Sequence, residues 1–167
     1  MNRSIIAARY TFPVIELAPI VMDLDRTVDE MVAGLWNTNP DITSEHFPDC
    51  RRGSRGLQEA RLWLAKPLED RQHRPEEEVR RRLEEAGFVP EDLPQLACLK
   101  EHADELWAAG MHFVAALGSS SVWRGSDGGY SPYLILNPDD RGFHLHWIGS
   151  EWGGPVWFVV RRGERSD

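Results

Sequence analysis

The fold of this chain is decided by residues 111–162, MHFVAALGSSSVWRGSDGGYSPYLILNPDDRGFHLHWIGSEWGGPVWFVVRR. Short apolar runs alternate here with residues that favour turns. The predicted strands cover 111–117, 122–124, 132–136, 143–148 and 156–160. Gly118 and the serines after it loosen or bulge the first strand before it resumes, and Asp127-Gly128 favours a hairpin turn. Because short turns make successive strands antiparallel, we predict a four-stranded meander.

The segment before this stretch predicts two helices. Residues 75–87, PEEEVRRRLEEAG, open with a proline and three glutamates, which favour a helix start, and end in a glycine. Each arginine follows a glutamate by one turn, which predicts the pairs Glu76–Arg80, Glu77–Arg81 and Glu78–Arg82. The basic run is therefore interpreted as a solvated, self-neutralised face. Residues 92–109 repeat apolar side chains at helical spacing and predict a helix packed on the sheet.

The N-terminal third carries weaker signals. Pro19 cannot donate a ladder hydrogen bond, so residues 18–24 are predicted to form an edge strand. Thr27 and Glu30 have the spacing of a capping box, which predicts a helix that begins after Thr27 and carries the apolar stripe Val28, Met31, Val32 and Leu35. Residues 36–56 are rich in Asn, Asp, Pro, Ser and Gly and predict a long loop.

Together these elements predict one α+β domain that spans residues 1–167. Its antiparallel meander of about four C-terminal strands, with one or two N-terminal strands, packs against two or three helices on one side. The last residues, 161–167, are expected to fray.

Composition and charge restrict the function. A net charge of −8 and a pI near 5.2 argue against a protein that binds duplex nucleic acid, because basic side chains supply most of that affinity. The same charge suits a basic partner protein. Cys50 and Cys98 form no CxxC pair and suit a reducing cytosol, so a cytoplasmic location is expected. The apolar run 12–22 is interrupted and too short to cross a bilayer, so no membrane contact is expected.

Several segments share a pattern with proteins of one bacterial family. The matching segments are DLDRTVDEMVAG (23–34), NPDITSEHFP (39–48), PEEEVRRRLEEAGFVP (75–90), VAALGSSSVWR (114–124) and HLHWIGSEWGGPVWFVVRR (144–162). In these segments the chain resembles an uncharacterised family of conserved hypothetical bacterial proteins, to which no activity is attached. Periodicity leaves residues 57–66 open between helix and strand. The resemblance implies a strand there, and it carries over no functional residue.

A metal site is one interpretation of His144-x-His146-x₄-Glu151. Two residues apart on a strand, both imidazoles point to one face of the sheet, as bidentate metal binding requires. Glu151 would supply an oxygen ligand from the following turn, and His112 is a candidate for a fourth group. The simpler alternative places Phe143, Leu145 and Trp147 in the core and both histidines toward water or a covering loop.

The tryptophans support a second interpretation. Trp147, Trp152 and Trp157, with His144 and His146 nearby, are candidates for an aromatic platform that meets a partner protein or a sugar. The alternative is a cluster of tryptophans in the core and turns. Contact with a partner is expected chiefly from Trp152, because it falls in a turn where no strand has to bury it.

These observations rank three hypotheses about function. The first is a non-catalytic protein-binding module, such as a regulator or inhibitor encoded on a mobile element of a bacterium or phage, with no cofactor. The second is a small metal-dependent enzyme that uses His144, His146 and Glu151 with a divalent metal. The third is a carbohydrate-binding sheet. No P-loop, GxGxxG or zinc-finger spacing occurs in the chain.

Overall fold

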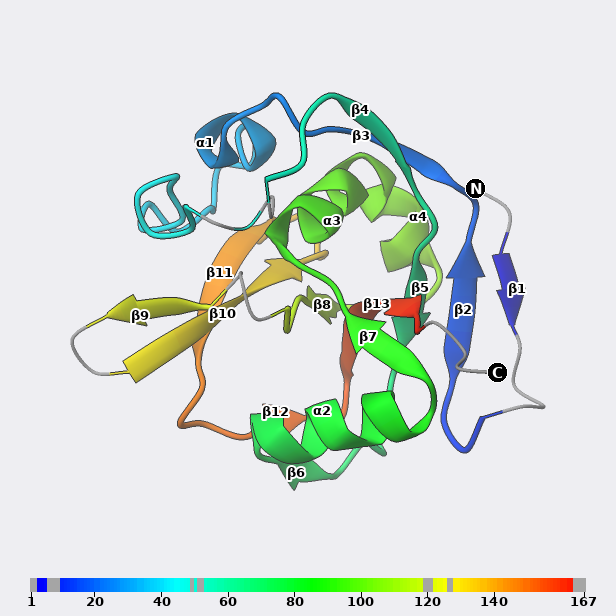
Figure 1. Cartoon of the computed structure of the whole chain (residues 1–167). Coiled ribbons are helices and arrows are strands. Elements are labelled where there is room, and N and C mark those ends of the chain that lie inside the picture. Colours follow the sequence, from blue (N-terminus) through cyan, green and yellow to red (C-terminus); the bar gives the residue numbers. More distant parts are fainter. Residues whose placement is uncertain are drawn as a thin grey trace.

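A mixed β-sheet runs through the middle of the molecule (Figure 1). The structure is a computed structural model that describes residues 3–5, 10–48, 50, 53–118, 122–125 and 128–163. In these residues the sheet follows the order β1-β2-β5-β13-β8-β10-β11, with β7 also beside β13 and β9 also beside β10. Its strands are β1 (Arg3–Ile5), β2 (Val14–Leu17), β5 (Trp63–Ala65), β7 (Phe88–Pro90), β8 (Phe113–Ala115), β9 (Trp123–Gly125), β10 (Gly128–Ile135), β11 (Gly142–Trp147) and β13 (Val156–Arg162).

The predicted meander is confirmed for three neighbouring strands and wrong for the last one. β10 pairs antiparallel with β8, β9 and β11, as expected. β13 does not continue beside β11 but returns to the centre, where it pairs parallel with β8 and antiparallel with β5 and β7. Phe158, Val159 and Val160 are consecutive and buried, so this strand needs cover on both faces and neighbours on both sides.

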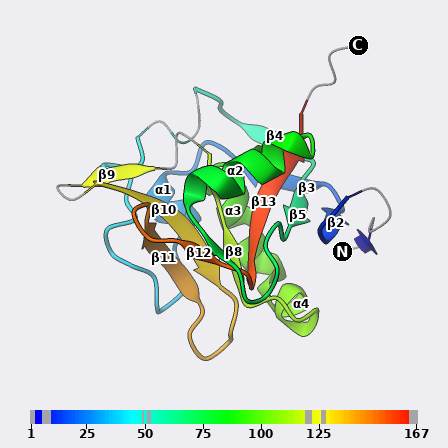
Figure 2. The same ribbon diagram turned by 90° about the horizontal axis from the view of Figure 1, so that it is seen from below.

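Helices cover both faces of the sheet, which corrects the expectation of helices on one side. α2 (Glu76–Glu85) packs Val79 and Leu83 against one face. α1 (Val28–Met31), α3 (Leu93–Ala97), the 3-10 helix η1 (Cys98–His102) and α4 (Ala103–Ala108) pack against the other. Figure 2, which views the molecule from below Figure 1, shows α2 in front of the sheet. The predicted helix 92–109 is thus observed as α3, η1 and α4 in succession.

The helix predicted at 75–87 forms, with the expected glycine after its C-terminus and two of the three expected Glu–Arg pairs. Gly87 follows it with a φ of 88°, a left-handed conformation that glycine adopts without strain. Arg80 and Arg82 each contact the expected glutamate at 3.5 and 2.9 Å. Arg81 instead bonds Glu85 at 2.8 Å, which keeps the outer face neutralised by a different partner.

The N-terminal third divides at Pro19. β2 joins the main sheet, whereas β3 (Ile20–Asp23) pairs with β4 (Leu57–Ala60) in a separate ribbon. The strand expected at 18–24 is therefore shorter than predicted, and another strand, β2, precedes it. Pro19 has no N–H to continue a ladder, which explains the break. The capping box of Thr27 and Glu30 is confirmed, with Thr27 N–H donating to Glu30 Oε1 at 3.0 Å.

The other expectations for this part of the chain are largely confirmed. Residues 57–66 form two strands, β4 and β5. The described part of loop 36–56 forms turns and contributes buried Ile42, Phe47 and Cys50 to the core. The expectation of a frayed tail at 161–167 is wrong for Arg161 and Arg162, which lie in β13, while residues 164–167 lie outside the described ones. Within the residues that the structure describes, no helix combines the length and apolar character that crossing a bilayer demands.

Candidate functional site

The β10–β11 hairpin divides its side chains between two environments. Ser131 lies opposite His146 and Tyr133 opposite His144, and these four face α2. Tyr130 lies opposite Trp147 on the reverse face, where Phe143 enters the main core. Side chains alternate along a strand, so the register alone assigns each residue to its face.

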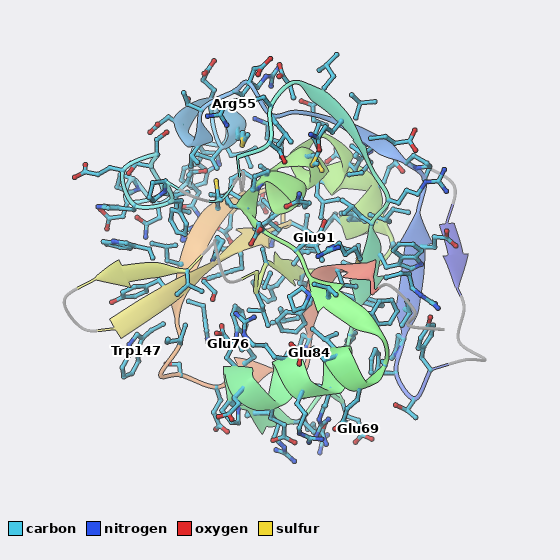
Figure 3. The ribbon with its side chains drawn as sticks, in the orientation of Figure 1. Arg55, Glu69, Glu76, Glu84, Glu91 and Trp147 are labelled. Carbon is cyan, nitrogen blue, oxygen red and sulfur yellow. The ribbon has the colours of Figure 1, made fainter. Side chains whose placement is uncertain are left out.

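On the α2 side a buried carboxylate organises the contacts. Glu76, 9% exposed, begins α2 and accepts a hydrogen bond from the Ser131 hydroxyl at 2.8 Å and one from Trp152 Nε1 at 3.4 Å. Its other oxygen lies 3.5 Å from Arg80. Figure 3 places Glu76 between the first turn of α2 and the sheet. The interpretation of this glutamate as part of a solvated face is therefore wrong, because it joins the stripe of Val79 and Leu83.

Trp152 belongs to this buried cluster, which corrects the expectation that it is exposed. Its side chain is 2% exposed, stacks on His146 at 3.8 Å and meets Phe158 edge-on at 5.4 Å. The reason is β12 (Trp152–Gly153), which pairs with β6 (His73–Arg74) and directs the indole under α2. Trp152 was expected in an exposed turn, but its residues pair with β6, and no local sequence pattern indicates this pairing.

His144 and His146 share one face as predicted, but they do not assemble with Glu151. His146 stacks on Trp152, His144 lies beside the Tyr133 ring at 5.8 Å, and Glu151 is exposed. His112 is engaged elsewhere, against Trp107 at 4.7 Å. Among the described residues, no group of three or more His, Cys, Asp or Glu side chains is placed to hold a metal ion.

Burial lowers the pKa of His146, against the opposite effect of the hydrogen bond that its Nε2–H donates to Ser150 O at 3.4 Å. His144 Nε2 is buried and makes no hydrogen bond within the described part of the chain. A neutral imidazole at His146 fits these surroundings, because burial disfavours the charged form.

The reverse face carries an aromatic row, defined here as Trp123, Tyr130 and Trp147 on the adjacent strands β9, β10 and β11. The rings of Trp123 and Tyr130 lie 5.4 Å apart, and His46 from the loop stacks on Trp123 at 4.0 Å. Trp147 stands at the outer end of the row and is 46% exposed (Figure 3). Its indole lies directly over Gly149, where a Cβ would collide with the ring.

The five candidate partner-binding residues thus separate. Trp147 remains strongly exposed, whereas Trp152 is buried and His144 and His146 are half-buried under α2. Trp157 lies on β13, which β8 and β10 separate from β11, and it packs against the main core.

Two features of the site were missed, although each had a signal in the sequence. Glu76, Val79 and Leu83 have the spacing of one helical stripe, which predicts that Glu76 faces the core. A two-residue hairpin turn at 126–127 would place Trp123 opposite Tyr130, as the observed register does. The turn residues themselves lie outside the described ones.

Comparisons of the chain with models of protein families, with curated proteins and with solved structures find no match.

Proposed function

We propose that this protein is a non-catalytic binding module whose partner protein docks on the aromatic row. The observation that carries the proposal is the exposed Trp147 at the end of three aligned aromatic residues. Tryptophan and tyrosine are enriched among the residues that dominate binding energy in protein interfaces, where each costs about 2 kcal/mol or more on truncation.

The setting of the row supports a binding role. Its members stand on paired strands rather than on a loop, so little conformational entropy is lost when a partner orders them. The contact of Trp147 with Gly149 restricts the indole before binding. A large side chain with one face against the protein and the other toward solvent can be covered by a partner without refolding.

Charge narrows the class of partner. At a net charge of −8 the chain attracts a basic protein and repels the phosphates of duplex nucleic acid. Association with a basic partner should therefore slow as salt is added. We assign no membrane contact and no cofactor to this function, and we place it in the reducing cytoplasm, which a chain with two cysteines and no CxxC motif suits.

A site-specific photocrosslink tests the proposal. A photoreactive phenylalanine analogue at Trp147 should capture one partner in cells, and the same analogue at Trp36, a 75% exposed tryptophan outside the row, should not. With that partner purified, Trp147→Ala should weaken binding by at least about tenfold, whereas Trp36→Ala should leave it unchanged. Equal capture from both positions, or equal affinity of Trp147→Ala and wild type, would reject the aromatic row as the docking surface.

The metal-enzyme alternative has its own test. Elemental analysis of protein purified without a histidine tag should find no stoichiometric zinc, iron or manganese. If the protein holds one equivalent of metal and the His144→Ala variant loses it, the binding-module proposal is rejected in favour of a metal site on the α2 side of the hairpin.

A further inference from the structure

A groove of about 970 Å³ lies apart from the aromatic row. It is bounded by residues 10–13, by residues 66–72 and by the C-terminal half of α2. Its size is in the range of small-molecule sites, which commonly occupy about 300–1,000 Å³. Figure 3 shows Glu69 of this groove beside the later turns of α2.

One wall of the groove is aromatic and firmly held. The rings of Tyr10 and Phe12 lie nearly parallel, with centroids 6.4 Å apart. Tyr10 packs on Phe88 at 5.0 Å, and its hydroxyl accepts a hydrogen bond from Arg162. A supported aromatic wall is a suitable surface for a flat, partly apolar ligand.

The charges around the groove cancel. Lys66, Arg81 and Arg82 line it together with three acids, Glu69, Asp70 and Glu85. Lys66 bonds Asp70 at 2.6 Å and Arg81 bonds Glu85 at 2.8 Å. Arg82 is engaged with Glu78, Gln72 and the Pro67 carbonyl. No lining cation in the described residues is thus left without an acceptor, so a phosphate or another strong anion finds no uncompensated charge here.

Three polar groups of the lining are still available to a ligand. Within the described residues, the Glu69 carboxylate, the Thr11 hydroxyl and the Gln72 amide nitrogen have no hydrogen-bond partner. The amide is oriented, because Gln72 Oε1 accepts from Glu69 N–H at 3.0 Å and from Arg82 Nη1 at 3.2 Å. The segment 66–72 that carries Glu69 and Gln72 is held by Gly154, which packs on the backbone of Glu69 and Asp70.

We propose that this groove binds a neutral saccharide. A sugar ring presents C–H groups on its faces and hydroxyls at its rim, which match an aromatic wall beside a carboxylate, a hydroxyl and an amide. The balanced charge selects against phosphorylated sugars. This site is separate from the aromatic row, so the failure of either proposal leaves the other standing.

NMR titration of the full chain tests the site. Amide resonances of residues 10–13 and 66–72 should shift with at least one of six neutral sugars: glucose, galactose, N-acetylglucosamine, maltose, cellobiose or lactose. Glucose 6-phosphate should bind more weakly than glucose. For the sugar that binds, Glu69→Gln should raise the Kd by about tenfold or more through loss of a charged acceptor, and Phe12→Ala by a similar factor. The matched control is Glu84→Gln on exposed α2 surface outside the groove, which should bind as wild type.

Three results would overturn the proposal. The first is the absence of shifts in the groove with every neutral sugar up to about 20 mM, well above the millimolar range of weak specific binding. The second is tighter binding of glucose 6-phosphate than of glucose. The third is unchanged affinity in Glu69→Gln, a folded variant being expected because this side chain is exposed and makes no hydrogen bond or ion pair within the described residues.

Discussion

Trp147 and Trp152 stand on either side of one turn, yet one indole is 46% exposed and the other 2%. Local sequence predicts the reverse, since Trp147 ends an alternating strand and Trp152 falls among glycines. Trp147 occupies the outer end of the sheet edge, where the core stops. Trp152 is drawn under α2 by the pairing of β12 with β6. Exposure is therefore decided by what the rest of the chain places over each residue.

The two faces of the β10–β11 hairpin repeat this contrast. On one face a glutamate, a serine and an indole N–H satisfy each other beneath α2. On the other face, the aromatic row keeps its outermost ring in solvent. The polar groups of Glu76, Ser131 and Trp152 are thus buried where they have partners, and an apolar ring is exposed where a partner protein would be needed to cover it.

The largest expected effect is on the buried tryptophan. Trp152→Ala should lower the free energy of unfolding by about 3–5 kcal/mol, because it removes a fully packed aromatic side chain and leaves a cavity under α2. Urea unfolding followed by circular dichroism measures this loss. If Trp152→Ala lowers the free energy of unfolding no more than Trp147→Ala does, the two tryptophans do not differ in their contribution to the core.

The next effect concerns the carboxylate beneath α2. Glu76→Ala should cost about 2–3 kcal/mol, because the Ser131 hydroxyl and the Trp152 N–H lose their acceptor in a buried site. Exposed Glu77→Ala on the same turn is the matched control and should change stability by less than about 0.5 kcal/mol. Equal stability of the two variants would mean that water replaces the Glu76 oxygens.

A smaller effect depends on pH. Burial holds the pKa of His146 below its ordinary value of 6.5, so the unfolded chain takes up a proton before the folded one. The stabilisation is complete above pH 6.5 and is lost as the pH falls through the folded pKa. His146→Phe preserves the stack on Trp152 and should flatten this decline, measured by urea unfolding at pH values from 7 down to about 5. If the stability of His146→Phe falls with pH as steeply as that of wild type, the pH dependence comes from another titrating group.

Carboxylates should not obscure this measurement. Hydrogen bonds from Ser44 and Thr27 lower the pKa values of Asp29 and Glu30 below 3.8 and 4.5, respectively. The stability that they contribute is present above those ordinary values and is lost only at lower pH.

The smallest effect on stability is expected at the exposed tryptophan. Trp147→Ala should change the free energy of unfolding by less than about 1 kcal/mol, since roughly half of this side chain already contacts water. Its consequence should appear in partner binding instead. A loss as large as that of Trp152→Ala would show that Trp147 is a core residue and not a docking residue.

Much of the local structure could be predicted because its causes are local. Thr27 and Glu30 cap a helix through their own spacing, and Gly87 ends α2 through its own conformational freedom. The hairpin of β10 and β11 follows from alternation and a short turn. Of the three residues of the aromatic row, the sequence analysis predicted a binding role for Trp147 but not for Trp123 or Tyr130.

Long-range placement could not be predicted in the same way. β13 carries a buried run that fits several positions in a sheet, and its parallel pairing with β8 depends on where β5 and β7 lie. Glu76 was interpreted from its charge, although its position on the apolar stripe indicated burial.

The sequence by itself determined the β10–β11 hairpin, α2 and the capping box of α1, because neighbouring residues supply the hydrogen bonds and the periodicity. Only the tertiary structure decided that α2 covers one face of the hairpin and that Trp152, not Trp147, is enclosed. The physical reason is that burial depends on contacts between segments far apart in the chain. A turn residue and a strand residue of the same type carry no local record of those contacts.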